Sequence, residues 1–327
     1  MEKLDMKKFE KYSSLLADIK KEVKKAVVGQ DKIVDGFLRG LLANGHVLVE
    51  GIPGIAKTLL VRTLAMTTGC QFSRIQFTPD LLPTDIIGIT TYEEGRGFYS
   101  VKGPIFANFV LADEINRAPP KTQSALLEAM QEKQATIGKE TFPMMVPFFV
   151  MATQNPIEQE GTYRLPEAQV DRFIFKLLMG YPSMDEEQIV LNTNMTLRKL
   201  EEYDLKPILT PKLIIEMQDF VKKIYLDKEV EKYIIRIIDA TRYPSKYNIK
   251  YARYIEWGAS PRASIALFIG AKTQALLLGK EYVTPQHVKD LAYDVLRHRI
   301  LLTYEAEAEK ITPDMVIKEI LSRVPVP

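Results

Sequence analysis

The 327-residue chain carries 44 lysine and arginine residues against 42 aspartate and glutamate residues, so its formal net charge is only +2. This balance gives no reason to expect binding to nucleic acid or to an anionic membrane surface. The single cysteine, Cys70, excludes an internal disulfide and a cysteine metal cluster, and three scattered histidines show no zinc-ligand spacing. The length exceeds that of a usual single domain, so we expect two domains.

Residues 1–30 are charged throughout and contain no apolar core of signal-peptide length, so we expect no export signal. The most apolar later stretches are residues 142–153, which hold two prolines, and residues 265–279, which hold Lys272. Neither is predicted to span a membrane. We therefore expect a cytoplasmic protein.

Five short apolar runs alternate with amphipathic segments between residues 46 and 179. The runs occupy residues 46–49, 72–77, 108–113, 148–153 and 173–178. This alternation favours an α/β fold in which helices cover a doubly wound parallel sheet. Beyond residue 183 only long amphipathic segments follow, which predict helices. We predict a nucleotide-binding core over residues 1–182, with an N-terminal helix and two hairpin insertions, and a smaller all-helical domain over residues 183–327.

The first predicted strand ends at Gly51, where a loop of glycine and proline leads into a helix. Gly51 and Gly54 let successive backbone N–H groups point into one cavity, and a helix N-terminus favours an anion there. Lys57 would then reach the β and γ phosphates of a nucleotide, and the Thr58 hydroxyl would hold magnesium. Ala56 stands where the usual pattern has glycine, and the loop tolerates this if φ at Ala56 is negative. The alternative is an ordinary turn.

The third apolar run brings two adjacent acids, Asp113 and Glu114, to the C-terminal end of a predicted strand, where ligands of open parallel sheets bind. Asp113 is placed to hold magnesium through water, and Glu114 is placed to polarise a water for attack on the γ phosphate. A solvated acidic turn is the alternative for this motif alone. Two motifs in this order on two predicted strands favour Mg²⁺-dependent chemistry on ATP.

The next predicted strand runs into Asn155, whose amide could orient the attacking water or contact the γ phosphate. Arg164 and Arg172 follow close behind. Arginine suits charge that spreads over phosphoryl oxygens, because its guanidinium is planar and always charged. The alternatives are a polar strand end and two ordinary surface arginines.

Four segments, in this order, resemble the MoxR family of AAA+ ATPases: "EGIPGIAKT", "VLADEINRAPPKTQSALLEAMQE", "ATQNPIEQEGTYRLPEAQVDRF" and "GASPRA". The resemblance covers nearly the whole chain, and the family's phosphate loop likewise tends to carry alanine at the position of Ala56. It implies a P-loop AAA+ core, a helical lid and a homo-oligomeric ring, usually of six subunits. It also implies that ATP and Mg²⁺ are the cofactors.

The resemblance assigns roles residue by residue. Asp113 and Glu114 become the metal and water acids, and Asn155 becomes the sensor on the neighbouring strand. Val28 and Gly29 match the segment that packs on the adenine. The phosphate loop, with the first helical turn, comprises Gly51, Ile52, Pro53, Gly54, Ile55, Ala56, Lys57, Thr58 and Leu59.

Two arginines acquire specific roles from the same resemblance. Arg172 resembles the arginine finger that reaches the nucleotide of a neighbouring subunit, with Arg164 as a competing candidate. Arg262 matches the family's second sensor, which contacts the phosphates from above. The alternative for Arg262 is simple capping of a helix that begins at Ser260 and Pro261.

Two further segments resemble insertions found in this branch of AAA+ proteins. Residues 87–103 and 134–147 each have β-type runs around a glycine-containing turn, so both are predicted to be hairpins. Aromatic side chains of the first hairpin could grip a client protein in the pore of the ring, or could pack on one another across the hairpin. These side chains are Tyr92, Phe98 and Tyr99.

We expect an ATP hydrolase with a mechanical or conformational output. The resemblance implies a chaperone-like factor that remodels partner proteins or helps them mature, and a von Willebrand-type domain protein is a common partner in the family. The alternatives are a magnesium-chelatase-like or nucleic-acid-remodelling motor, and a scaffold that binds ATP as a switch without hydrolysing it. The balanced charge weighs against the nucleic-acid motor, and Glu114 weighs against the switch, which needs no water-activating acid.

Overall fold

The computed structural model describes residues 4–52, 54, 56–95, 97–155, 161–192 and 199–327. Two residues of the predicted phosphate loop, Pro53 and Ile55, lie outside the described residues. Within the described part of the chain, no helix combines the length and the apolar character that crossing a membrane requires.

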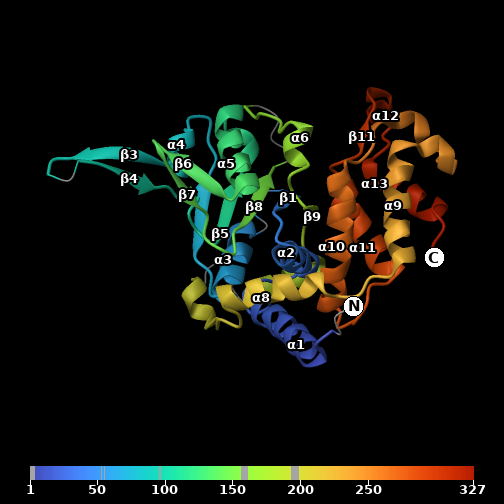
Figure 1. The fold of residues 1–327 in the computed structure, drawn as a ribbon, viewed down its shortest axis with the longest axis horizontal. Coiled ribbons are helices and arrows are strands. Elements are labelled where there is room, and N and C mark those ends of the chain that lie inside the picture. The colour runs from blue at the N-terminus through green and yellow to red at the C-terminus, as the bar shows by residue number, and fades with distance from the viewer. Residues whose placement is uncertain (1–3, 53, 55, 96, 156–160, 193–198) are drawn as a thin grey trace.

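Five parallel strands form the central sheet in the order β2–β5–β8–β1–β9 (Figure 1). Each of the five predicted apolar runs is one of these strands, so the doubly wound parallel sheet is confirmed. Because β5, β8 and β1 are neighbours, the residues at their carboxyl ends lie along one edge of the sheet. The strands are β1 (Val47–Gly51), β2 (Phe72–Gln76), β5 (Phe109–Asp113), β8 (Phe149–Gln154) and β9 (Phe175–Met179).

Helices cover both faces of the sheet, and each face has its own apolar core. Successive side chains of a strand point to opposite faces, so Val47 and Val49 join one core while Leu48 joins the other. The first core lies under α1 (Met6–Val23), α2 (Asp31–Leu42) and α3 (Lys57–Thr67), and the second lies under α4 (Pro83–Ile87) and α5 (Pro120–Glu132).

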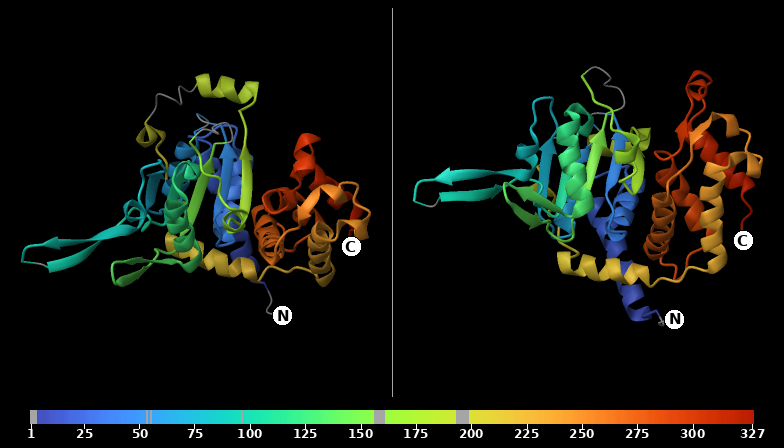
Figure 2. Two further views of the ribbon diagram at one scale, coloured as in Figure 1. Left: turned by 90° about the horizontal axis from the view of Figure 1, so that it is seen from above. Right: turned by 45° about the horizontal axis from the view of Figure 1, so that its top comes forward.

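The C-terminal part of the chain is a helical lid, as predicted (Figure 2). A short antiparallel pair, β10 (Ile255–Trp257) and β11 (Leu301–Leu302), adds to the helices. The sequence does not reveal this pair, because strands of two or three residues leave no alternation to read. The lid helices are α9 (Lys228–Arg242), α10 (Pro261–Leu277), α11 (Pro285–Leu296), α12 (Tyr304–Ala308) and α13 (Pro313–Arg323).

The lid packs against the β9 edge of the sheet. Arg39 of α2 forms an ion pair with Asp294 of α11, with 3.1 Å between Nη2 and Oδ2, and its guanidinium lies 5.7 Å from the ring centroid of Phe175 in β9. Apolar side chains of α10 and α11 belong to the same core cluster as those of α2 and β9. The lid therefore continues the hydrophobic core on one side of the sheet.

Two helices connect the core to the lid. α7 (Met184–Asn192) follows β9, and α8 (Pro211–Lys222) runs along the core beside α1 and α2 (Figure 1). The side chain of Gln218 in α8 donates a 2.8 Å hydrogen bond to the carbonyl of Leu41 in α2. The domain boundary between residues 182 and 183 stays a prediction.

Both predicted hairpins are present. β3 (Gly88–Glu93) and β4 (Gly97–Lys102) pair in antiparallel fashion and extend away from the core (Figure 1), and β6 (Gln134–Ile137) pairs with β7 (Glu140–Pro143). Tyr92 and Phe98 face each other across the first hairpin with 5.2 Å between ring centroids, so the predicted cross-strand packing is found. The two residues nevertheless remain 63% and 79% exposed.

Candidate nucleotide-binding site

The predicted phosphate loop joins β1 to α3. Strand β1 ends at Gly51, and α3 begins at Lys57 with Ala56 as its N-cap residue. Ala56 adopts φ 59° and ψ 29°, and Gly54 has φ 84°, so these two loop residues are left-handed. The expectation of a negative φ at Ala56 was therefore wrong. That expectation treated alanine as a first-turn helical residue, whereas the turn into α3 requires a left-handed residue, which costs alanine about 1–2 kcal/mol.

Lys57 folds back over the loop. Its Nζ donates a 2.5 Å hydrogen bond to the carbonyl of Gly51. Burial lowers the pKa of Lys57, and the negative charges of Asp113 and Glu114 act in the opposite direction. The ammonium group is thus half-buried, and the charges of both acids favour its protonated form. Thr58 follows in the first turn of α3, also half-buried.

The two acids stand at the end of β5, and Thr153 of β8 joins them. Its hydroxyl donates a 2.7 Å hydrogen bond to Oδ1 of Asp113 and accepts a 2.8 Å bond from the backbone N–H of Glu114. Glu114 has φ 57°, a left-handed conformation that this bond helps to hold. Sequence reasoning missed Thr153. The available signal was a hydroxyl at the end of a buried strand, two residues before Asn155.

One further oxygen of each acid, Oδ2 of Asp113 and Oε2 of Glu114, is engaged by β2 or by the turn after β5. Nη2 of Arg74 lies 2.7 Å from Oδ2 of Asp113. Nε2 of Gln76 donates a 2.9 Å hydrogen bond to Oε2 of Glu114, and Nε of Arg117 lies 3.2 Å from the same oxygen. Sequence reasoning missed these three partners as well. The signal on β2 was the alternation of Arg74 and Gln76, which places both side chains on one face.

Asn155 follows β8 and is 5% exposed, between the ends of β5 and β1. The edge of the sheet thus gathers Gly51 with its loop, the pair Asp113 and Glu114, and Asn155. The sequence predicted that these residues lie close together, because each follows a predicted parallel strand.

The residues present fit a magnesium ion that is shared with phosphates. Thr58 and Asp113 supply hard oxygen donors, which Mg²⁺ prefers. Among the described residues, no group of three histidine, cysteine, aspartate or glutamate side chains could hold a metal ion alone. Mg²⁺ commonly binds proteins through one or two carboxylates together with substrate phosphates, which matches this sparse donor set.

The segment predicted to pack on adenine lies before α2. Val28 is half-buried, and Gly29 has φ 74°. A Cβ atom on Gly29 would lie only 2.7 Å from the carboxyl carbon of Glu186, which belongs to α7. The start of α7 therefore covers this segment, and the left-handed backbone at Gly29 favours glycine there.

The three candidate arginines have different surroundings. Nη1 of Arg172 donates a 2.8 Å hydrogen bond to the carbonyl of Leu127 in α5. Arg262, at the start of α10, has Nη1 3.6 Å from Oδ2 of Asp171, so the structure places it beside the turn that carries Arg172. Arg164 forms a 3.1 Å ion pair with Glu167, and its side chain is 86% exposed.

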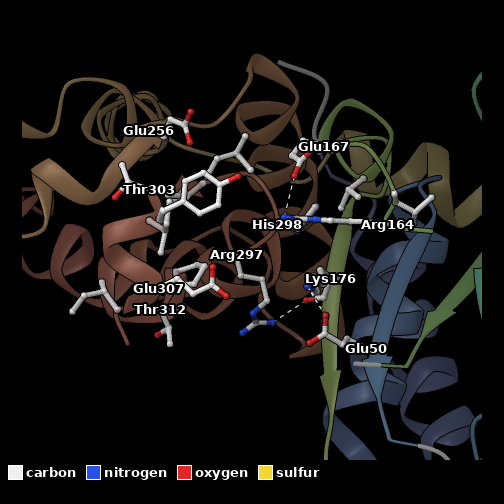
Figure 3. Close-up of a pocket in the computed structure, with 18 of the residues that line it drawn as sticks. Glu50, Arg164, Glu167, Lys176, Glu256, Arg297, His298, Thr303, Glu307 and Thr312 are labelled. Carbon is white, nitrogen blue, oxygen red and sulfur yellow. Dashed lines mark hydrogen bonds and ion pairs between the residues drawn. The ribbon is translucent and has the colours of Figure 1, made fainter. Parts of the chain in front are cut away.

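A cavity of about 670 Å³ lies between the core and the lid (Figure 3). Lys176 and Glu50 meet there at 2.6 Å, and Arg297 and His298 enter from the lid side. Lys57, Thr58 and the two acids of β5 are not among its lining residues. Among the described residues, the cavity is therefore distinct from the phosphate loop, and Glu50, the residue before Gly51, lines it.

Comparison with known proteins identifies the family. The model of the ATPase family associated with various cellular activities (AAA) matches residues 46–175, and the model of the AAA lid domain matches residues 251–320. Chaperone MoxR1 of Mycobacterium tuberculosis is 50% identical over 309 residues, covering 94% of this chain and 81% of that protein. The chain belongs to the MoxR family of AAA+ ATPases.

Other relatives extend the comparison. YeaC of Bacillus subtilis, an uncharacterised protein, is 45% identical over 96% of this chain and 95% of its own. The crystal structure of a Cytophaga hutchinsonii protein assigned as an ATPase superposes with a TM-score of 0.92 at 47% identity, covering 98% of both chains. MoxR-family membership and the core-plus-lid fold are thus consistent over nearly the full length.

Proposed function

We propose that this MoxR-family protein is an ATP hydrolase that couples hydrolysis of Mg-ATP to the remodelling or maturation of partner proteins. The observation that carries the proposal is the arrangement at the sheet edge. There, Thr153 bonds to Asp113 and to the backbone of Glu114, and so fixes the two acids relative to each other at the same edge of the sheet as the loop that leads to Lys57. A scaffold that only binds ATP would have no use for a fixed second acid.

Each residue at this edge has a role in the proposed reaction. The N–H groups of the loop and Lys57 bind the phosphates, while Thr58 and Asp113 would hold magnesium. When bound, the ion neutralises negative charge on the phosphate oxygens. Glu114 polarises the attacking water, and Asn155 orients that water or the γ phosphate.

The contacts of Glu114 imply a step before hydrolysis. Its Oε2 is occupied by Gln76 and Arg117, so these two donors would compete with the attacking water for this oxygen. We infer that nucleotide binding exchanges these contacts and frees Glu114 to act on water.

We further propose that Arg172 completes the site of a neighbouring subunit, and that Arg262 acts beside it. Support comes from the lid, which packs on the β9 edge and brings Arg262 to within 3.6 Å of Asp171, the residue before Arg172. Arg164 is the weaker candidate because Glu167 already neutralises it. This arrangement requires a homo-oligomer, for which we propose the six-membered ring.

The output is proposed to be chaperone-like. The relative from Mycobacterium tuberculosis is named a chaperone. Tyr92 and Phe98 are largely exposed and pair next to the turn of a hairpin that projects from the core (Figure 1), which suits contact with a protein client. A von Willebrand-type partner and a cytoplasmic location remain predictions from the sequence.

Two variants test the proposed hydrolysis. Lys57→Ala should abolish ATP binding in calorimetry, because Lys57 contacts ground-state phosphate. Glu114→Gln should keep ATP affinity and stop phosphate release, because this acid acts mainly in the transition state. The matched controls are Lys121→Ala and Glu128→Gln, two exposed positions on α5, which should behave as wild type. Wild-type phosphate release by Glu114→Gln would refute the assignment, and absence of release in wild-type rings would favour the switch.

A further inference from the structure

The turn that carries Arg172 is held by the lid. Arg299, which follows α11, donates from Nη2 to the carbonyls of Asp171 at 3.1 Å and Phe173 at 2.7 Å, and from Nη1 to the carbonyl of Ile174 at 3.2 Å. One guanidinium therefore caps three carbonyls of the turn between α6 (Glu167–Val170) and β9.

The side chain of Asp171 strengthens the same attachment. Its Oδ1 accepts a 2.7 Å bond from Nε of Arg299, and its Oδ2 accepts a 2.9 Å bond from the hydroxyl of Ser260. The side chains are 17% exposed for Asp171 and 3% exposed for Arg299. Ser260 is also the N-cap residue of α10, so this carboxylate joins the turn to two separate lid segments.

Arg172 itself is less constrained. Its side chain points to the core, where Nη1 bonds to Leu127, while Nε is buried without a partner among the described residues. Two adjacent residues of one turn thus bond to different parts of the protein: Asp171 bonds to the lid, and Arg172 bonds to α5. Hydrogen bonds are directional, so a lid that moves relative to the core carries the backbone of this turn with it.

We propose that Asp171 is a positioning residue that couples the lid of one subunit to the arginine it presents to its neighbour. This inference rests on the proposed function, because it requires Arg172 to act in the neighbouring site. Movement of the lid then sets the place of Arg172, and the state of one subunit governs hydrolysis in the next. The Asp171–Arg299 ion pair is the mechanical link.

The first test compares Asp171→Asn with wild type in assembled rings. Asparagine keeps the size of the side chain but removes the charge that holds Arg299. We expect kcat to fall by roughly 10- to 100-fold, the scale of a misplacement of about 1 Å, with the Kd for ATP unchanged. Asp171→Glu should recover part of kcat. Asp219→Asn, which removes an exposed carboxylate paired with Lys222, is the control.

A mixing experiment separates positioning from loss of structure. Glu114→Gln subunits can donate Arg172 but cannot hydrolyse, and Arg172→Ala subunits can hydrolyse but cannot donate, so their mixture is expected to regain phosphate release. Asp171→Asn is then added to one partner at a time. In the Glu114→Gln donor it should abolish the recovery, whereas in the Arg172→Ala acceptor it should leave the recovery intact. Sizing in ATP verifies that every variant assembles.

The outcomes distinguish the inference from the proposed function. Equal recovery with Asp171→Asn in either partner would overturn the inference and leave the shared site standing. An equal loss in both partners would also overturn it, because Asp171 would then be merely structural. Failure of the parent mixture without Asp171→Asn would overturn the shared site and the inference together.

Discussion

Oδ2 of Asp113 accepts a 2.7 Å hydrogen bond from Nη2 of Arg74, so the carboxylate proposed to hold magnesium is already paired with a cation of the same chain. Arg74 lies on β2, and its Nε is a further 3.2 Å donor to the same oxygen. The guanidinium occupies an oxygen of the acid that is proposed to hold magnesium. We therefore expect Arg74 to compete with the ion and to set how readily it binds.

Replacement of Arg74 should make metal binding easier. The Arg74 side chain is 46% exposed, and exposed ion pairs contribute about 0.2–1 kcal/mol. Arg74→Gln should thus lower the Mg²⁺ concentration for half-maximal binding of a fluorescent ATP analogue by about two- to fivefold. Arg62→Gln, at an exposed arginine of α3, is the control. A higher Mg²⁺ requirement in Arg74→Gln would show that Arg74 assists the metal.

Substitution of Ala56 tests the left-handed loop. Ala56→Gly should raise the free energy of unfolding by up to about 1 kcal/mol, because glycine adopts φ 59° without the alanine penalty but loses more chain entropy. ATP affinity should change little. Ala56→Val should lose stability and affinity, since a branched side chain is strained there. Urea unfolding and calorimetry measure both, and normal behaviour of Ala56→Val would contradict the conformation.

His46 should make the protein sensitive to mild acid. Its Nδ1 accepts a 3.0 Å bond from the N–H of Val150, its Nε2 lies 3.2 Å from the carbonyl of Met130, and burial lowers its pKa from 6.5 to about 4. Above pH 6.5 the imidazole is neutral in both states. Below it the unfolded state binds more protons, so stability falls as pH falls, and the loss is complete only below the folded-state pKa of about 4.

The size of this effect is measurable. From neutral pH to one unit below the unfolded pKa, His46 should account for about 1.4 kcal/mol of lost stability. Urea unfolding at both pH values should therefore show a smaller loss for His46→Gln than for wild type. Burial also lowers the pKa of His298, which leaves part of the slope in the variant. Identical pH slopes would mean that His46 does not titrate as described.

The exposed hairpin pair should matter for clients and not for folding. The double variant Tyr92→Ser, Phe98→Ser should retain basal phosphate release, because neither ring contacts the sheet edge. Burial of one such side chain against a client contributes about 1.5–3 kcal/mol to the binding free energy, and the serine variant loses this contribution. The affinity for carboxymethylated lactalbumin, an unfolded probe, should therefore fall at least about tenfold. Fluorescence anisotropy measures it. Unchanged affinity would assign the rings to hairpin packing alone.

The sequence predicted the sheet and the main site for a physical reason. Parallel strands that are buried on both faces appear as apolar runs, and their carboxyl ends share one edge, so Lys57, Asp113 and Asn155 could be brought together without coordinates. The prediction of a negative φ at Ala56 was wrong, because helix propensity does not describe the residue that comes just before a helix begins.

The partners of the site residues were beyond sequence reasoning. Arg74 and Asp113 are separated by 39 residues, and Asp171 and Arg299 by 128. No local sequence pattern predicts pairs at such sequence separations, because each residue alone resembles an ordinary surface charge. Asp171 and Arg299 meet because the lid packs at the β9 edge, and this position of the lid depends on the packing of whole helices.

The measurement closest to the central claim is phosphate release by a mixture of Glu114→Gln and Arg172→Ala subunits, compared with each variant alone. If neighbouring subunits share the site, each variant alone is inactive, the mixture regains activity, and wild-type specific activity falls on dilution below the assembly range. The arginine-finger contribution of roughly 10³–10⁵ in rate makes this recovery easy to detect. No recovery in the mixture, together with a specific activity that stays constant on dilution, would contradict the account and place the complete site within one chain.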